Sequence, residues 1–496
     1  MNIKRIVLAV FLAAGLTTGV VWLLGDGLAV RAAPVYGLQV CPSGCAFSSI
    51  QDAVDAAAPG ELIQVATGVY TGVHARGGVT QVVYISKTVT VRGGYNADFS
   101  ACNPISYPTT LDAQGQGRVI WMSGSITPVI EGLRITGGNA YGLGGTDWGD
   151  NAGGGIFVVS ATASISGNVI YSNTGGSDNS FGGGLYLKNS AASLTHNTIT
   201  SNTAAHGDGM YLFYSPASLS HNIISGNGSG LTGWGGGVAL RHSDANLTDN
   251  TITGNRGGYG GGVNMDRGEP LLNHNIITGN TGFDGGGLFL YVSNARLTNN
   301  LVQGNVANQN GGGLWLYKGT PAIINTVVAD NHLTQDACFG TGIYIEASSV
   351  RLLHTTIARN TGGDGSGLHI TGYEYSGSYY PGTVAITNTL IVNHGVGITV
   401  TAGNTATLNA TLWHSVGTKW SDNVVHANDH EGDPAFAADG YHLTASSAAI
   451  NKGVNADVTS DIDGELRPQD GGYDLGADEV KAEFKLYLPL VLRNRN

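Results

Sequence analysis

Aromatic residues recur at fixed places after a glycine-rich turn, and their spacing would suit sugar binding. The turn precedes alternating apolar residues in GGGLYLK (182–188), GGGLFLY (285–291) and GGGLWLY (311–317). If the first apolar residue points inward, the next residue and the one two further on point outward to solvent. Rings stacked about 4.8 Å apart on a sheet present apolar faces for sugar rings. The residues predicted to bind substrate in this way are Tyr211, Phe213, Phe289, Tyr291, Trp315, Tyr317, Tyr344 and His369.

The same residue types also fit any pleated sheet, where they stabilise cross-strand contacts without a ligand. Plain sheet packing therefore stands beside sugar binding as an interpretation of these rings.

Two cations on the same predicted surface would suit a polysaccharide lyase. Lys188 and Arg241 occupy matching positions two repeats apart, so we expect their side chains to converge across Phe213. A lyase needs a base beside a uronate carboxyl, here Lys188, and a cation to neutralise that carboxyl, here Arg241. Arg241 also neighbours Asp266, and an exposed ion pair there would contribute little. An inverting hydrolase is disfavoured because Asp266 and Glu346 are three repeats apart, roughly 14 Å.

Two further polar sets contain residue types that bind metal ions. A turn column of histidines is interrupted by Asp249 and Asn299, which favours a polar turn position over a metal site. An acidic segment near the C-terminus has the oxygen ligands that calcium prefers, but its spacing matches no known loop and favours turns. We predict no metal ligands and no cofactor, with calcium as the one candidate. The two sets are His196, His221, His274 and His354, and Asp457, Asp461, Asp463 and Glu465.

The candidate residues lie within a repeat whose period is 25 to 30 residues. The last glycine of the turn falls at positions 155, 184, 209, 237, 262, 287, 313, 342, 367 and 397. A second motif keeps step with it, as in HNTITSN (196–202) and HNIISGN (221–227). Each unit holds short alternating strands between Gly or Asn turns, and none can bury its own apolar face. Stacked units therefore predict an all-β, right-handed parallel β-helix.

Asparagines at two places in the repeat predict ladders along the stack. Asn tolerates the left-handed conformation that a sharp turn needs, and its amide can bond to its neighbour one coil away. We expect a structural role for both sets. They are Asn197, Asn222, Asn250, Asn275 and Asn300, and Asn202, Asn227, Asn255, Asn280 and Asn305.

The N-terminal residues indicate export. Lys4 and Arg5 precede an apolar run and small residues around Ala32, which is typical of a signal peptide over residues 1–32. The run is also long enough for an uncleaved membrane anchor.

The remaining chain divides into four predicted parts. SSIQDAVDAAAPG (48–60) has apolar residues at helical spacing, which predicts a capping helix within an N-terminal cap. The predicted parts are the cap at 33–60, the β-helix at 61–430, a closing region at 431–479 and a tail at 480–496.

The charge limits the classes of partner that the protein can bind, and the cysteine content indicates its cellular compartment. Removal of residues 1–32 leaves 20 basic and 34 acidic residues, a net charge of −14. Nucleic acid and anionic membranes need clustered Lys and Arg, so this balance argues against both. The four cysteines suit an oxidising compartment, and Cys41 could pair with Cys45 or with Cys102.

Several of these segments resemble those of a known family. SIQDAVDAAAPGELIQVATGVYTG, TVTVRGGY, GLRITGGNA and the NTI repeats resemble bacterial right-handed parallel β-helix repeat proteins with the pectin-lyase-like fold. Residues 432–479 are similar to the choice-of-anchor Q region, and FKLYLPLVLRN (484–494) resembles a short tail of exported proteins. The resemblance implies the fold and export. It does not imply one activity, since the family includes lyases, hydrolases and adhesins.

These observations predict a secreted or surface-displayed protein that binds extracellular polysaccharide, neutral or weakly acidic, through its outer aromatic residues. A polysaccharide lyase and a purely structural envelope protein are the alternatives. We expect membrane contact only through an uncleaved N-terminal segment or a processed tail.

Overall fold

The computed structural model describes residues 37–480 except 177–178, 229 and 470. The chain divides into two units, and the unit described here begins at Leu38. The predicted signal peptide and nearly all of the predicted tail lie outside the described residues. No helix within the described ranges is long and apolar enough to cross a membrane.

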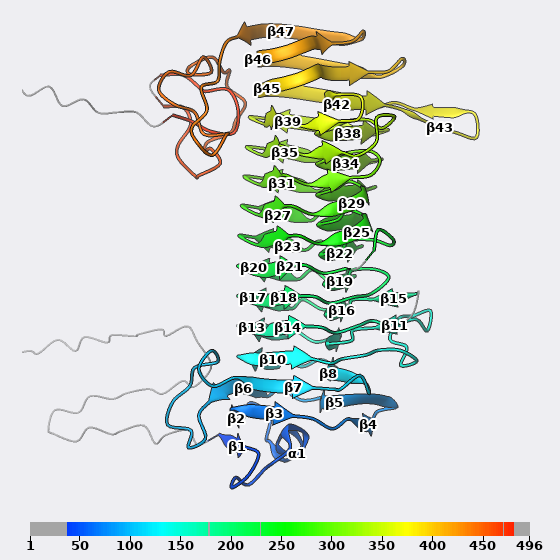
Figure 1. Ribbon diagram of the computed structural model, residues 1–496, viewed down its shortest axis with the longest axis vertical. Helices are drawn as coiled ribbons and strands as arrows, with labels where there is room; N and C mark the ends of the chain where they lie inside the picture. Colours follow the sequence, from blue (N-terminus) through cyan, green and yellow to red (C-terminus); the bar gives the residue numbers. More distant parts are fainter. Residues whose placement is uncertain (1–36, 177–178, 229, 470, 481–496) are drawn as a thin grey trace, which may run out of the picture. The chain divides into compact units, whose positions relative to one another are not determined.

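Short strands follow one another around each coil and pair with the same strands of the next coil (Figure 1). Three faces result, and every pairing along them is parallel. Face 1 contains β5 (Val79–Ile85), β8 (Arg118–Ser123), β12 (Ile156–Val159), β16 (Leu185–Lys188), β19 (Met210–Phe213), β22 (Val238–Arg241), β26 (Val263–Asp266), β30 (Leu288–Tyr291), β34 (Leu314–Tyr317), β38 (Ile343–Glu346) and β42 (Ser366–Thr371).

The other two faces repeat this arrangement. Face 2 contains β1 (Leu38–Val40), β2 (Leu62–Ala66), β6 (Thr90–Tyr95), β9 (Val129–Glu131), β13 (Ser164–Ser166), β17 (Ser193–Thr195), β20 (Ser218–Ser220), β23 (Asn246–Thr248), β27 (Leu271–Asn273), β31 (Arg296–Thr298), β35 (Ala322–Ile324) and β39 (Ser349–Leu353). Face 3 contains β3 (Gly68–Tyr70), β7 (Thr109–Asp112), β10 (Leu133–Thr136), β14 (Val169–Tyr171), β18 (Thr198–Thr200), β21 (Ile223–Ser225), β24 (Thr251–Thr253), β28 (Ile276–Thr278), β32 (Leu301–Gln303), β36 (Val327–Ala329) and β40 (Thr356–Ala358).

Longer strands and short edge strands complete the stack. The last coils are formed by β45 (Thr383–Val400), β46 (Thr405–Trp420) and β47 (Val424–Glu431), with β45 continuing all three faces. Short strands before face 1 pair in the same parallel way; they are β11 (Asn151–Ala152), β15 (Ser180–Phe181), β25 (Arg256–Tyr259), β29 (Thr281–Asp284), β33 (Val306–Ala307), β37 (His332–Leu333) and β41 (Thr361–Gly362). Near the start of the stack, β4 (His74–Arg76) pairs antiparallel with β5.

Inward aliphatic residues form one core along the stack. Leu288 pairs with Leu314 in register, and Leu314 pairs with Ile343. All three are fully buried in a single cluster that extends from Val40 to Trp413. Burial of this apolar surface supplies the main stabilisation of a solenoid whose coils contact only their neighbours. The predicted parallel β-helix is confirmed.

Both predicted asparagine ladders are present. Asn222 Nδ2 donates to Asn250 Oδ1 at 3.0 Å and to the carbonyl of Leu194 at 2.9 Å, and the contact repeats from coil to coil. The second ladder extends further, from Asn173 to Asn360. The left-handed backbone conformation was one reason to expect asparagine at these positions, and this reason is wrong. The positive φ belongs to the residue that precedes each ladder asparagine.

The histidine column predicted from the sequence occupies this position of positive φ. His196, His221, Asp249 and His274 have φ between 52° and 56°, and Asn299 follows at 57°. Asn, Asp and His are the non-glycine residues that best tolerate this region. The column is therefore a set of left-handed turns.

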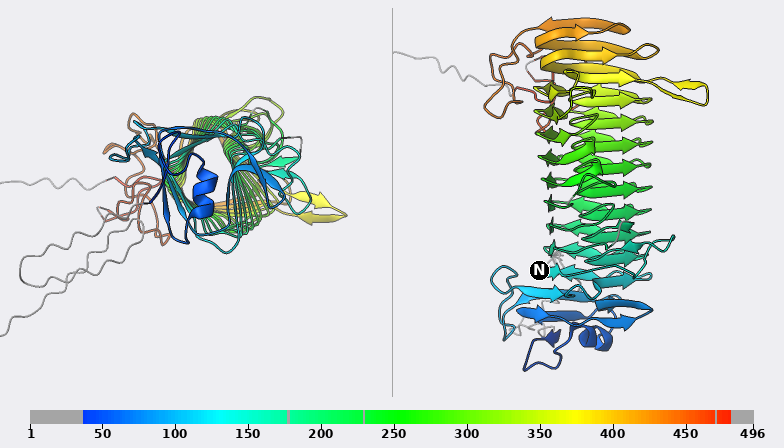
Figure 2. Two further views of the ribbon diagram at one scale, coloured as in Figure 1. Left: turned by 90° about the horizontal axis from the view of Figure 1, so that it is seen from below. Right: turned by 45° about the vertical axis from the view of Figure 1, so that its right-hand side comes forward.

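A single short helix, α1 (Ile50–Ala56), lies at the N-terminal end of the described residues. The Ser49 hydroxyl accepts from the amide of Asp52 at 3.3 Å, and Ile50, Ala53 and Val54 are buried in the core cluster. Seen along the stack, α1 overlaps the ring of coils (Figure 2). Its role as a cap stays a prediction.

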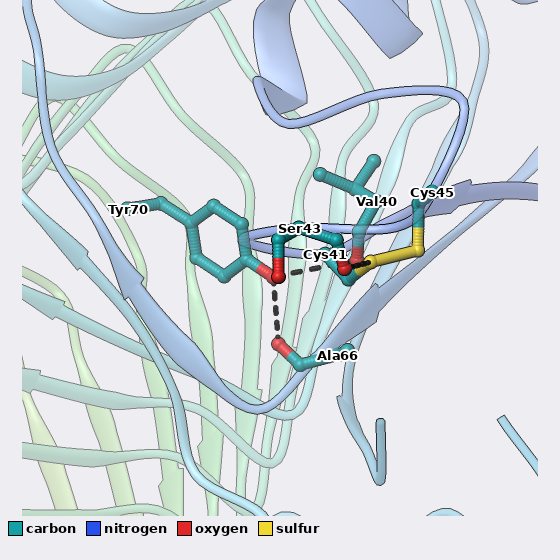
Figure 3. Close-up of a disulfide and its surroundings, with 6 residues drawn as sticks. All are labelled: Val40, Cys41, Ser43, Cys45, Ala66 and Tyr70. Atoms are coloured by element: carbon teal, nitrogen blue, oxygen red, sulfur yellow. Dashed lines mark hydrogen bonds between the residues drawn. A yellow bond between two sulfur atoms is a disulfide. The ribbon is translucent and has the colours of Figure 1, made fainter. Parts of the chain in front are cut away.

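A disulfide joins Cys41 and Cys45 beside this end (Figure 3). The hydroxyl of Tyr70 donates to the carbonyl of Ala66 at 2.9 Å and lies near that of Val40. The sequence left Cys45 and Cys102 as possible partners of Cys41, and the structure shows the pairing with Cys45. Cys102 is free and exposed.

The C-terminal segment, residues 433–480, packs against the outside of face 3. Leu443, Ile462 and Leu475 form a second apolar cluster with outward residues such as Val327 and Leu390. Arg467 and Glu479 form a fully buried ion pair within the segment, with Nη1 and Oε2 2.7 Å apart.

Candidate functional site

Most residues next to the inward positions of face 1 are buried, which corrects the sequence prediction that they face solvent. Of the predicted sugar-binding residues, five are less than a tenth exposed: Tyr211, Phe213, Phe289, Tyr344 and His369. One cause is the residue before a glycine turn, which packs over an outward position. Phe181 packs edge-on against Tyr211 at 4.9 Å, and Phe339 contacts His369 at 4.6 Å.

Much of this column is a ring stack that is buried except for the partly buried Trp121 at its start. Trp121, Phe157, Tyr186 and Tyr211 follow one another with ring centroids 4.1, 5.2 and 5.8 Å apart. Burial raises the pKa of Tyr211 to about 12, so its hydroxyl stays neutral. This part of face 1 fits the plain-packing interpretation.

Further along face 1 the covering residues leave a groove of about 550 Å³. It crosses the five consecutive strands β22, β26, β30, β34 and β38. The residues that line it are Trp234, Arg241, Tyr259, Asn264, Asp266, Arg267, Phe289, Tyr291, Trp315, Tyr317 and Glu346. Six of these eleven carry aromatic rings, which gives the groove an apolar floor with polar groups at intervals.

The rings contact one another across neighbouring coils. Trp315 meets Phe289 edge-on at 4.8 Å and Tyr317 at 6.2 Å, and Tyr291 stacks on Tyr317 at 5.3 Å. Tyr259 contributes from the short strand β25 and lies 5.1 Å from Phe289. Trp315, Tyr291 and Tyr317 are half-buried, so each keeps part of its surface open to the groove.

One end of the groove carries two arginines around a carboxylate. Asp266 Oδ1 lies 2.9 Å from Arg267 Nη1, and Asp266 Oδ2 lies 3.3 Å from Arg241 Nε. The Arg241 guanidinium also lies over the rings of Trp148 and Trp234, at 5.3 and 5.6 Å. These three charged groups leave one net positive charge at this end, held in place by cation–π contacts.

The other end carries Glu346. Burial raises the pKa of its carboxyl above the ordinary value, while Lys318 and the indole of Trp315 lower the pKa and Asp284 raises it again. The Nε1 atom of Trp315 is itself buried without a hydrogen bond of good geometry. A carboxylate at this end of the groove can accept hydrogen bonds from sugar hydroxyls.

Lys188 is not part of the groove. Its ammonium pairs with the carboxylate of Asp147 from the loop that precedes β11, and its side chain is 15% exposed. Arg241 faces Asp266 and the tryptophans. Because the Lys188 ammonium faces Asp147 and lies outside the groove, it is not placed to act as the base that a lyase needs on a ligand bound there.

The groove gathers five of the predicted site residues and adds others that the sequence analysis had not placed there. The predicted ones are Arg241, Phe289, Tyr291, Trp315 and Tyr317. Trp234 and Tyr259 were missed, although each directly precedes a glycine turn, in WGGG (234–237) and YGGG (259–262). They form one column, with Trp234 bridged to Tyr259. An aromatic residue directly before the glycines is the sequence feature that could have identified both residues.

Cation-binding groups are few in the described part of the chain. There, one cluster brings three ligand atoms within 4.8 Å of one another, from His442, Asp463 and Asp478. Of the acidic residues predicted for calcium, only Asp463 belongs to it. Asp461 instead accepts backbone N–H groups of Asp463, Glu465 and Glu479, which fits the predicted turn role.

Comparison with known proteins adds a family match and several structural likenesses. Residues 154–333 match the family described as the right-handed beta helix region. No curated protein matches the chain. The match confirms the right-handed β-helix repeat over the coils that contain most of the groove.

Three solved structures resemble the chain at low identity. The A-module of mannuronan C-5 epimerase AlgE6 from Azotobacter vinelandii is 13% identical, covers 78% of this chain and 94% of its own, and has a TM-score of 0.38. The Dettilon tailspike protein is 13% identical over 78% of this chain and 65% of its own, with a TM-score of 0.39. Pectate lyase Pel9A is 13% identical over 90% of this chain and 98% of its own, with a TM-score of 0.35.

Proposed function

We propose that this protein binds a polysaccharide chain in the groove of face 1. The observation that carries the proposal is the lining: six aromatic rings, all but Phe289 at least partly open, beside five polar or charged side chains. Apolar faces of sugar rings pack against aromatic side chains, and the hydroxyls around them need donors and acceptors. Asn264, Asp266 and Glu346 supply those groups.

The charges of the groove favour a neutral or weakly acidic chain. Arg241 and Arg267 share the single carboxylate of Asp266, so one positive charge is left for an acidic sugar. The protein as a whole carries a net charge of −12, which repels densely charged polyanions.

Binding without chemistry is the better supported function. Lys188, the base that a lyase would need, is paired with Asp147 outside the groove. A purely structural role accounts for the buried ring stack but not for rings left part-open beside charged groups. We therefore expect no unsaturated product when the protein is incubated with polygalacturonate or alginate. New absorbance from an unsaturated uronate, absent in a Lys188→Met variant, would favour the lyase instead.

We further propose that the protein is exported and is released or displayed at the cell surface, with α1 closing one end of the stack. The pattern of residues 1–32 supports export, and the Cys41–Cys45 disulfide suits an oxidising compartment. The apolar face of α1 that packs into the core supports the cap. Cell fractionation that recovers the intact chain from the cytosol would contradict export.

A glycan array tests the proposed binding. The parent protein should retain a small set of neutral or weakly acidic polysaccharides, and Trp315→Ala should lose them. Trp315→Phe keeps a ring at the same place and should retain part of the signal. If the parent binds no glycan, or if Trp315→Ala binds as the parent does, the groove is not a glycan site.

A further inference from the structure

A hairpin rich in tyrosine projects from the stack. Figure 1 shows it next to β42 of face 1. It consists of β43 (Tyr373–Tyr375) and β44 (Ser378–Tyr380), which follow β42 on face 1. The strands are antiparallel and pair Tyr373 with Tyr380 and Glu374 with Tyr379. Because side chains alternate along a strand, Tyr379 points to one side of the hairpin, and Tyr373, Tyr375 and Tyr380 point to the other.

The side with Tyr379 is fixed to the stack. The Tyr379 hydroxyl donates to the carbonyl of Ala402 at 3.1 Å and accepts from Asn404 Nδ2 at 2.8 Å. The Tyr379 ring lies so close to Gly372 that a Cβ atom there would be 2.3 Å from it. Hydrogen bonds and close packing therefore hold the hairpin in one position.

The opposite side continues the ring surface of the groove. Tyr317, which lines the groove, meets Tyr373 edge-on at 5.7 Å, and Tyr373 stacks on Tyr375 at 6.4 Å. The Lys318 ammonium lies 3.9 Å from the ring centre of Tyr373 and 4.8 Å from that of Tyr317. Together with Tyr291, these rings form an unbroken series from the groove floor to the hairpin.

The outer end of this series is open. Tyr375 is 61% exposed and Tyr380 is 46% exposed. Tyrosine adds contact area at little conformational cost and carries a hydroxyl for hydrogen bonding, which makes it well suited to a binding surface. A group of exposed rings next to a ring-lined groove indicates that both contact the same ligand.

We propose that the hairpin is an outer binding ledge for the polysaccharide, on which sugar units that leave the groove over Tyr317 stack against Tyr373 and Tyr375. This inference rests on the proposed function and adds that the ligand is a chain longer than the groove. Affinity therefore rises with chain length beyond the length that fills the groove.

Size-graded oligosaccharides of cellulose, xylan, polygalacturonate and mannuronate test the ledge by calorimetric titration of the full chain. We expect Tyr375→Ser to weaken binding of the long oligomers about fivefold and to leave that of the short ones unchanged. Tyr141→Ser is the matched control, since Tyr141 is 67% exposed and lies outside the groove and the hairpin. It should bind every length as the parent does.

The two possible failures are distinct. If Tyr375→Ser keeps the parent's affinity for long oligomers while short oligomers still bind, the ledge is wrong and the groove stands. If the parent binds none of these oligomers at any length, both the proposed groove site and the proposed ledge are wrong. Circular dichroism that matches the parent shows that the variant is folded, as expected for a change at an exposed side chain.

Discussion

The role of a single side chain in this protein is determined by its position in the coil. Asn250 illustrates this: its Oδ1 accepts from the backbone N–H and from Nδ2 of Asn222, while its own Nδ2 donates to Asn275 Oδ1 and to the carbonyl of Leu219. Every polar atom of a fully buried amide is thereby satisfied, which is the condition for placing it in an apolar core.

Asn250→Ala should therefore be costly. It leaves both Asn222 donors and the Leu219 carbonyl buried without their partner, and each such group costs about 1–3 kcal/mol. We expect the free energy of unfolding in urea to fall by about 3 kcal/mol or more. Asn246→Ala, on the same coil but exposed, should change it by less than about 0.5 kcal/mol. Equal losses in the two variants would show that the ladder is not stabilising.

At the scale of strands and loops, the sequence predicted the repeating strands and turns but not the residues that cover the outer side of face 1. The glycine positions and the NTI motif predicted the strands of face 1 and the ladders, because both depend on local turn chemistry and alternation. The exposure of Tyr344 and His369 was predicted wrongly because alternation shows which side of a strand a residue occupies, not whether another segment covers that side. Trp234 and Tyr259 were missed for the same reason.

The C-terminal segment contains a charge cluster around His442. Burial lowers the pKa of His442, but hydrogen bonds to Asp439 and Asp463 outweigh this and raise the pKa to about 9, above the ordinary 6.5. A raised folded-state pKa means that the stabilisation is complete below about pH 6.5 and disappears as the pH rises through about 9.

Calorimetry of the parent and of His442→Gln tests this. The difference in melting temperature between them should be constant below pH 6.5 and should shrink to nothing above pH 9. A difference that stays the same across that range would mean that the ion pairs of His442 contribute nothing to the packing of residues 433–480.

At the scale of the whole molecule, the groove exists only because coils stack in register. Its lining comes from the face 1 strands β22, β26, β30, β34 and β38 and from residues next to them, and no single coil contributes more than a few of its side chains. The repeat therefore does more than bury a core: it sets rings at the spacing of adjacent strands along one face. The sequence could place these rings in register but could not show where the covering residues leave them open.

The central claim is that the rings of the groove, and not the ring stack from Trp121 to Tyr211 on the same face, hold the polysaccharide. The direct measurement is the affinity of Trp315→Ala and Trp121→Ala for a polysaccharide that the parent binds. Trp121 lies on face 1 outside the groove, stacked on Phe157, and is the matched control. We predict that Trp315→Ala loses about 30-fold or more in affinity, as expected for a central aromatic contact, and that Trp121→Ala binds as the parent does. Equal affinity of the two variants would contradict the account.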